Sequence, residues 1–170
     1  MDETLLHTIV RRDKGGKGRT WIKLDGLWHG SQERPCASEL IGFCRDLAPT
    51  RILTTATADY ARFFLNEFNF FFAHEEIITR YEYIIEHQRS GGWMDTRIET
   101  EVINHRNEPN AILIDNMFWS DNTDKMTYLG IDSSRYIKIR EYLGGDDPEK
   151  FYSVELPVIK DKLMELVSEC

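Results

Sequence analysis

Three apolar runs in this chain each end in a small or acidic polar residue, and this pattern narrows the folds open to it. The runs are Trp-Ile-Lys-Leu-Asp-Gly at 21–26, Ile-Leu-Thr-Thr-Ala at 52–56 and Ala-Ile-Leu-Ile-Asp-Asn at 111–116. Buried parallel strands are apolar throughout, and polar side chains that follow them gather at the carboxyl edge of the sheet. The runs therefore predict an edge that brings together Asp25, Thr54 and Asp115.

Helical patterns lie between and after these runs. Apolar residues recur at helical spacing between Arg34-Pro35 and Pro49, after Thr57, and over 155–167. Further strands are expected at 51–55, 111–115 and 135–139. Alternating strands and helices are typical of a parallel sheet with crossover helices, so the predicted class is α/β, a Rossmann-like parallel sheet flanked by helices.

The middle of the chain has a different pattern. Segments 80–87 and 96–104 are rich in β-forming residues, and 88–93 between them has the composition of a turn. We expect an antiparallel hairpin inserted before the third strand, with no large cap domain. The predicted organisation is an N-terminal segment, 1–19, followed by a single domain, 20–170.

The N-terminal segment contains a basic loop in an acidic protein. Residues 11–19 include five basic residues and three glycines, whereas the whole chain has a net charge of −8. An acidic chain disfavours broad binding to nucleic acid phosphates, so a nucleic acid partner through Arg11–Arg19 is possible but not favoured. The loop is interpreted as a solvated surface segment, with contact to a phosphorylated ligand as the alternative.

The cysteines and the hydropathy suggest a compartment. Cys36 and Cys44 would lie about 12 Å apart along one helix, too far for a disulfide. The chain has no CxxC pair, no signal peptide pattern and no apolar run of transmembrane length. Zinc is therefore not indicated, no membrane association is expected, and we predict an intracellular protein of the cytoplasm or nucleus.

Four segments resemble motifs of the haloacid dehalogenase superfamily, in particular the compact phosphatases that act on the polymerase C-terminal domain (the NLI-interacting-factor-like group). They are Arg34-Pro35 with the helix after it, 52–61 with its strand, threonine and Tyr-Ala helix, Ile114-Asp115-Asn116, and the tail from Leu129 to Leu156. The resemblance covers roughly Trp21 to Leu166. It implies a haloacid dehalogenase-like fold.

The resemblance also implies roles for individual residues. In that family one aspartate attacks phosphorus, the aspartate two residues later is the acid and base, and a threonine and a lysine hold the phosphoryl oxygens. A later aspartate binds Mg²⁺. Here these roles would fall to Asp25 as acid and base, Thr54 or Thr55 as the phosphate-binding hydroxyl, and Asp115 as the metal ligand, together with Asp25.

The nucleophile position of this pattern is Lys23, which cannot form an acyl phosphate or bind a metal ion. The family's phosphate-binding lysine also lacks a counterpart, because no lysine occurs between Lys23 and Lys125. Loss of a covalent nucleophile typically costs about 10⁴–10⁶ in rate. We hypothesise that the Lys23 ammonium replaces the metal between Asp25 and Asp115. No cofactor is then expected, and Mg²⁺ would bind only if the site is still active.

These observations favour a phosphatase-like domain that has lost phosphoaspartate catalysis and acts as a binding or regulatory module. Its expected partner is a protein or a phosphopeptide. The alternative is a Mg²⁺-dependent phosphatase acting on a phosphoprotein or a small phosphate ester. Two readings of the first motif stay open: Asp25-Gly26 can be a simple turn after a strand, and Lys23 can point away from the pocket if the register shifts by one residue.

Overall fold

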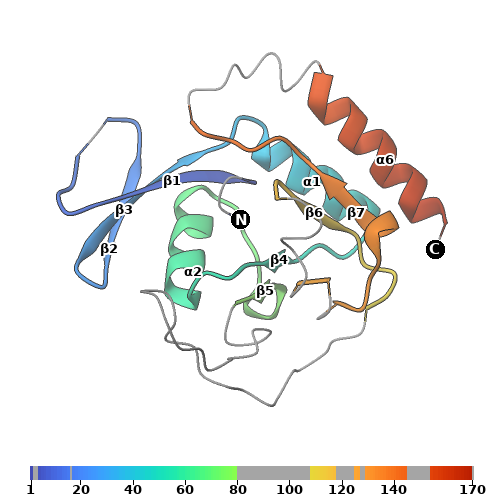
Figure 1. Cartoon of the computed structure of the whole chain (residues 1–170), viewed down its shortest axis with the longest axis horizontal. Coiled ribbons are helices and arrows are strands. Elements are labelled where there is room, and N and C mark those ends of the chain that lie inside the picture. The colour runs from blue at the N-terminus through green and yellow to red at the C-terminus, as the bar shows by residue number, and fades with distance from the viewer. Residues whose placement is uncertain are drawn as a thin grey trace, which may run out of the picture.

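The computed structural model describes residues 1, 4–15, 17–79, 108–117, 125–126, 129–144 and 154–169, and in these ranges the chain forms a mixed α/β structure (Figure 1). The elements are β1 (Leu6–Arg11), β2 (Thr20–Leu24), β3 (Leu27–Glu33), α1 (Ala37–Leu47), β4 (Ile52–Leu53), α2 (Ala58–Glu67), η1 (His74–Glu76), β5 (Ile77–Ile78), β6 (Leu113–Asp115), η3 (Ser133–Arg135), β7 (Tyr136–Lys138) and α6 (Leu156–Ser168). The hairpin expected over 80–104 lies outside the described residues.

The first three strands form an antiparallel sheet with the order β1-β3-β2. Asp25 and Gly26 connect β2 to β3 with positive φ angles of 50° and 80°. A two-residue Asp-Gly turn with both φ angles positive matches the twist of an antiparallel hairpin. The expectation that 21–26 forms a buried strand of a parallel sheet is therefore wrong, and the alternative of a simple turn at Asp25-Gly26 is confirmed.

The burial pattern of β2 explains why this strand is antiparallel and covered on one face. Ile22 and Leu24 pack against the core, whereas Lys23 between them is exposed. This alternation is typical of a half-buried strand and not of a parallel strand covered on both faces. Gly30 on β3 leaves room for the Trp21 ring of the neighbouring strand β2, because a Cβ atom at position 30 would lie 2.6 Å from that ring.

Two short parallel pairs lie beside this sheet. β4 pairs with β5 through Ile52↔Ile77 and Leu53↔Ile78, and β6 pairs with β7 from Leu113↔Tyr136 to Asp115↔Lys138. The expectation of parallel strands is thus confirmed for these segments. The described residues form two separate parallel pairs, however, and no extended parallel sheet joins them.

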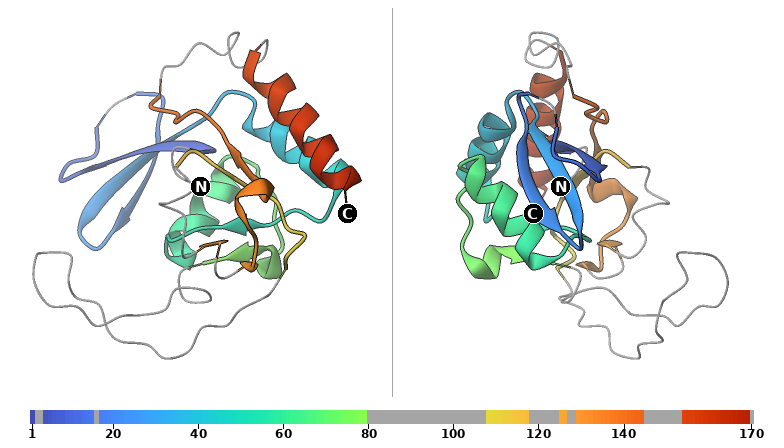
Figure 2. Two further views of the ribbon diagram at one scale, coloured as in Figure 1. Left: turned by 45° about the vertical axis from the view of Figure 1, so that its right-hand side comes forward. Right: turned by 90° about the vertical axis from the view of Figure 1, so that its left-hand side faces the viewer.

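The helices follow the expected apolar periodicity. α1 begins after Pro35 and ends at Leu47, two residues before Pro49, and α6 runs from Leu156 to Ser168. The two helices lie side by side in Figures 1 and 2. Leu40 of α1 belongs to one apolar cluster with Ile159 and Leu163 of α6. None of the helices in the described ranges has the length and apolar character needed to cross a bilayer.

The apolar pair at the start of β1, Leu5-Leu6, is part of the core. Leu5 is 7% exposed and Leu6 is fully buried, and both pack in a cluster with Ile41, Ile52 and Phe64. The Leu5 carbonyl accepts a hydrogen bond from the Arg34 backbone N–H at 2.8 Å. The apolar patch at the start of the chain therefore links the antiparallel sheet to the helices and to β4.

Candidate functional site

A buried carboxylate at the end of β6 is the centre of the candidate site. Asp115 is 4% exposed, and its Oδ2 atom forms a buried ion pair with the Nζ atom of Lys125. Parallel strand β6 positions the carboxylate at its carboxyl end, as the apolar run 111–114 predicts. Lys125 lies ten residues further along the chain and is 9% exposed. A buried charge needs such a partner, because burying an isolated carboxylate is costly.

Thr4 contacts the second oxygen of the Asp115 carboxylate, Oδ1. Its hydroxyl lies 2.9 Å from Asp115 Oδ1 and 2.8 Å from Asn116 Oδ1, and it can donate to either oxygen. The Asn116 backbone N–H also donates to Asp115 Oδ1, at 2.7 Å. Both carboxylate oxygens of Asp115 therefore have partners from the protein itself.

The main chain of Asp115 is held as firmly as its side chain. Its carbonyl oxygen accepts hydrogen bonds from the Ile139 backbone N–H at 2.9 Å and from the Tyr136 hydroxyl at 3.1 Å. These bonds come from β7 and the residue that follows it. The carboxylate is thus placed by a strand that is anchored on the side of β7, so its position does not depend on a bound ligand.

The electrostatic surroundings favour the ionised form of Asp115. Burial raises the pKa of this carboxyl group, but the positive charges of the amino terminus and Lys125 lower it, as do the hydrogen bonds from Lys125 and Thr4. The sum of these effects holds the pKa of Asp115 below its usual range. At neutral pH Asp115 is therefore a carboxylate, and its ion pair with Lys125 balances its charge inside the protein.

This lowered pKa predicts how stability depends on pH. A carboxyl group with a lower pKa in the folded state stabilises the fold fully above its unfolded pKa, about 3.9, and loses that contribution as the pH falls through the folded pKa. We expect the free energy of unfolding of the wild type to exceed that of Asp115→Asn by a constant amount above about pH 5 and by a shrinking amount below about pH 4. Urea unfolding of both proteins across this range measures the difference. A difference that does not change with pH would contradict the assignment.

Thr54 follows its strand as expected but has a local partner. It is 3% exposed, and its hydroxyl oxygen accepts a hydrogen bond from the Ala56 backbone N–H at 3.1 Å. Its own backbone N–H donates to the Ile78 carbonyl at 3.0 Å. Thr54 shares no hydrogen bond with Asp115, and Thr55 is exposed. In this arrangement the Thr54 hydroxyl stabilises the turn between β4 and α2.

Lys23 and Asp25 do not join Asp115. Both side chains are exposed, Lys23 on β2 and Asp25 in the turn to β3, and this hairpin projects away from β6 in Figures 1 and 2. Lys23 lies over the Trp28 ring, with 5.9 Å between Nζ and the ring centroid. The hypothesis that Lys23 neutralises a pocket of Asp25 and Asp115 is therefore corrected. A lysine does neutralise Asp115, but it is Lys125.

The arrangement around Asp115 does not suit Mg²⁺. Magnesium needs oxygen ligands in near-octahedral geometry, usually including one or two carboxylates. Asp115 offers a single carboxylate, one of whose oxygens is paired with the Lys125 ammonium. Among the described residues, no group of three His, Cys, Asp or Glu side chains is placed to hold a metal ion. The observed residues therefore do not fit the metal that the family resemblance implies.

The sequence-based reasoning missed Thr4 and Lys125. Thr4 directly precedes the apolar pair Leu5-Leu6, but a polar residue in this position does not indicate a contact with a carboxylate 111 residues away. Lys125 gave no signal either, since its neighbours are mostly polar. Only the folded structure shows that its ammonium pairs with the Asp115 carboxylate.

The chain matches none of the protein-family models, and no curated protein is significantly similar to it.

Proposed function

We propose that this chain is a phosphatase-like domain of the haloacid dehalogenase type that has lost phosphoaspartate catalysis and acts as a binding or regulatory module. The order of its elements supports the proposal. β4 is followed by Thr54 and α2, and β6 ends at Asp115 and is followed by Asn116; each strand belongs to a parallel pair. These are the positions at which the resemblance places the phosphate-binding threonine and the metal-binding aspartate.

The ion pair of Asp115 with Lys125 is the observation that best supports the proposed loss of catalysis. A phosphoaspartate enzyme needs this carboxylate for a divalent cation, which lets an anionic nucleophile approach an anionic phosphate. Here the ammonium of Lys125 supplies the compensating charge. Two unit charges about 4 Å apart repel each other by roughly 4 kcal/mol at an effective dielectric of 20, and a divalent ion doubles this repulsion. Mg²⁺ would have to bind against that repulsion.

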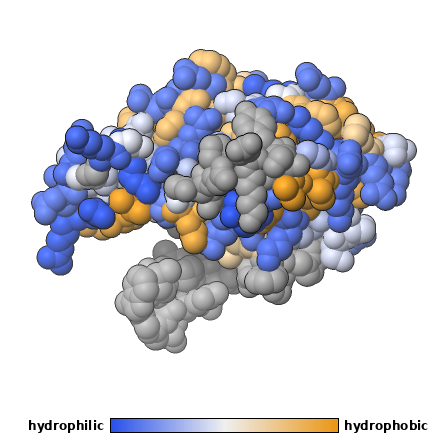
Figure 3. All heavy atoms as spheres, turned by 90° about the horizontal axis from the view of Figure 1, so that it is seen from above, coloured by the Kyte–Doolittle hydropathy of each residue, from blue (hydrophilic) through white to orange (hydrophobic). Residues whose placement is uncertain are grey.

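The three-stranded sheet offers a surface for an acidic or phosphorylated partner. Exposed basic residues gather on β1, β2 and the loop between them, in a protein whose net charge is −8. They are Arg11, Arg12, Lys14, Lys17 and Lys23. The Nζ atoms of Lys14 and Lys23 lie 5.4 and 5.9 Å from the centroid of the Trp28 ring. Figure 3 shows mainly hydrophilic residues at this end of the molecule. Ammonium groups beside an aromatic ring suit a phosphorylated or acidic peptide, and we assign the binding role to this surface.

Hydrolysis of a generic aryl phosphate, with and without Mg²⁺, tests the loss of catalysis. We expect no turnover above that of buffer by the wild type or by Lys23→Asp, because Lys23 is remote from Asp115. Mg²⁺-dependent turnover by the wild type that is abolished in Asp115→Asn would contradict the proposal and identify an active phosphatase.

Binding of a phosphopeptide and its unphosphorylated form, followed by fluorescence anisotropy, tests the binding role. We expect the phosphopeptide to bind more tightly, and the double variant Lys14→Ala/Lys23→Ala to reduce this binding by at least about 100-fold, since two charge-assisted contacts of about 1.5–3 kcal/mol each are lost. Lys162→Ala on α6 is the matched control and should leave binding unchanged. Equal affinity of wild type and double variant would rule out this surface as the binding site.

A further inference from the structure

The antiparallel sheet has an inner face that packs on α2 and an outer face that does not (Figure 1). On the inner face, the Thr8 hydroxyl lies 2.7 Å from the Tyr60 hydroxyl of α2, and the His29 ring packs edge-on against the Tyr60 ring. Side chains alternate between the two faces along each strand. Lys23, exposed between two residues that pack on the core, therefore belongs to the outer face.

One row of the outer face places an indole ring between cations. Trp28 of β3 lies directly opposite Arg11 of β1 and Lys23 of β2. Residues in such opposite positions share a face, with their Cβ atoms about 5 Å apart. Lys14 joins them from the loop after β1, since its Nζ atom lies 5.4 Å from the centroid of the Trp28 ring. Because Arg11, Lys14 and Lys23 are all exposed, their charges are available to a ligand.

The next row of the outer face is apolar. Gly30 of β3 lies opposite Ile9 of β1 and Trp21 of β2. The Trp21 ring covers Gly30, at the place where a Cβ atom would lie 2.6 Å from it. Ile9 and Trp21 are both partly exposed. The two rows are two residues apart along the strands, roughly 7 Å. An apolar platform with an aromatic ring thus lies one row away from a group of cations.

The row beyond this platform is covered by the chain itself. A Cβ atom on Gly144 would lie 2.9 Å from the His7 ring, which also packs edge-on against Tyr142 with 6.3 Å between the ring centroids. His7 is two residues from Ile9 on the same face of β1. The segment around Gly144 therefore limits the accessible part of the outer face to the apolar row and the cationic row.

Carboxylates border the cations along the chain. Asp13 directly precedes Lys14, and Asp25 lies two residues after Lys23; both carboxylates are exposed. A nucleic acid strand carries a phosphate at every nucleotide and binds along a continuous basic groove. These carboxylates interrupt such a groove, whereas a single phosphate can pair with the cations between them. The outer face therefore suits one phosphorylated side chain better than a nucleic acid strand.

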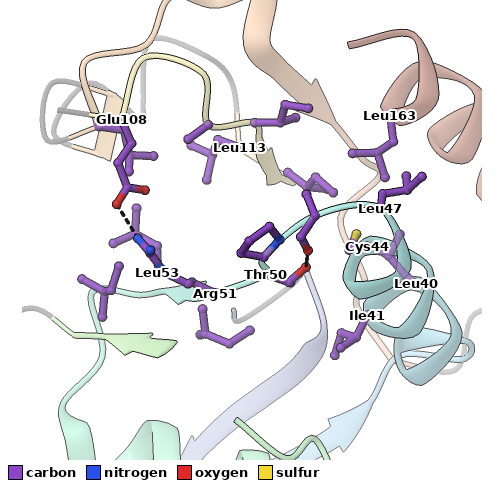
Figure 4. A pocket seen from close by; sticks show the side chains of 18 of the residues that line it. Leu40, Ile41, Cys44, Leu47, Thr50, Arg51, Leu53, Glu108, Leu113 and Leu163 are labelled. Carbon is purple, nitrogen blue, oxygen red and sulfur yellow. Dashed lines mark hydrogen bonds and ion pairs between the residues drawn. The ribbon is translucent and has the colours of Figure 1, made fainter. Parts of the chain in front are cut away.

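A cavity elsewhere in the molecule is not suited to a phosphate. It has a volume of about 620 Å³ and is lined by β4 and by the segment that includes β6. Figure 4 shows Leu53 and Leu113 on opposite sides of this cavity. Arg51, which also lines it, forms an ion pair with Glu108. A phosphate buried among these apolar side chains would lack a cation of its own, at a large cost in free energy.

We infer that the outer face binds a phosphotyrosine side chain of the partner peptide, with its ring on Trp21 and its phosphate among Arg11, Lys14 and Lys23. This inference rests on the proposed function, in which this surface takes a phosphopeptide, and it names the phosphorylated residue. Phosphotyrosine joins a phosphate of nearly two negative charges to an aromatic ring, so one side chain matches both rows. Phosphoserine supplies the phosphate but no ring for the apolar row.

Three fluorescent peptides of one sequence test the inference with the unmodified protein. They carry phosphotyrosine, phosphoserine or tyrosine at the same position. By fluorescence anisotropy we expect the phosphotyrosine peptide to bind about five- to tenfold more tightly than the phosphoserine peptide, because ring contacts add to the charge contacts. The tyrosine peptide should bind most weakly. Equal affinity of the two phosphopeptides would overturn the inference and leave the proposed function standing, whereas the absence of binding by both would overturn both. Tighter binding of a single-stranded oligonucleotide would also overturn the inference.

Protein variants locate the ring contact. Trp21→Leu should weaken binding of the phosphotyrosine peptide by about five- to tenfold and leave binding of the phosphoserine peptide unchanged. Phe71→Leu, at a 68% exposed aromatic position outside the sheet, should change neither. Thermal unfolding shows whether both variants fold, and the phosphoserine peptide reports whether the cations are still in place. An equal loss for both phosphopeptides in Trp21→Leu would mean that Trp21 only supports the sheet, and it would overturn the inference.

Discussion

Lys125→Ala should lower the free energy of unfolding by about 3–5 kcal/mol, the range typical of breaking a buried ion pair by removing one partner. The side chains of Lys125 and Asp115 are 11% and 5% exposed, so water cannot replace the lost ammonium efficiently. The remaining carboxylate must then stay buried without a counter-charge or take up a proton. Urea unfolding at neutral pH, monitored by tryptophan fluorescence, measures the change.

Two comparisons separate this effect from the general loss of a lysine. Lys23→Ala removes an exposed ammonium from β2 and should change the free energy of unfolding by less than about 0.5 kcal/mol. Asp115→Asn/Lys125→Met removes both charges together and should be more stable than Lys125→Ala. If Lys125→Ala and Lys23→Ala had equal, small effects, Lys125 would not be the internal counter-charge of Asp115.

Phe64→Ala should lower the free energy of unfolding by about 3–5 kcal/mol, because truncating a buried aromatic residue removes apolar contact area and leaves a cavity. Phe64 on α2 is fully buried and lies at the centre of an aromatic cluster. Its ring centroid is 4.9 Å from that of Tyr60, 5.1 Å from that of Phe63 and 6.1 Å from that of Phe68. Denaturant unfolding of the purified variant measures the loss.

Phe71→Ala is the matched control for this substitution. Phe71 lies in the same aromatic stretch of the sequence but is 68% exposed, so its truncation should change the free energy of unfolding by at most about 0.5 kcal/mol. A loss of similar size in both variants would mean that the aromatic cluster around Phe64 does not determine the stability of the core.

The helices and the short parallel strands were predictable because each leaves a local pattern. The apolar face of α1 and its end before Pro49 follow from residue spacing and from the geometry of proline. The first motif was misread because an apolar run that ends in Asp-Gly fits two structures. It can be a buried parallel strand with a catalytic residue at its end, or an antiparallel strand that enters a hairpin turn. The exposed Lys23 between Ile22 and Leu24 favours the second structure.

The candidate site was predictable in part for the same reason. Asp115 is buried at the end of its strand and Thr54 follows β4, as the apolar runs before them predict. The residues that contact Asp115 were not predictable, because Thr4 is 111 residues away in the sequence and neither Thr4 nor Lys125 belongs to a recognisable motif. Charge balance required a cation near a buried carboxylate, but it did not specify which one.

The sequence by itself determined the elements whose causes are local: the amphipathic helices and the short apolar strands with polar ends at 52–54 and 113–115. The tertiary structure alone decided which edges of these strands are paired, which lysine neutralises Asp115, and that a cavity separates β4 from β6. The physical reason is that periodicity and turn chemistry act over a few residues. Strand pairing and the neutralisation of a buried charge depend instead on groups that only the folded chain brings together.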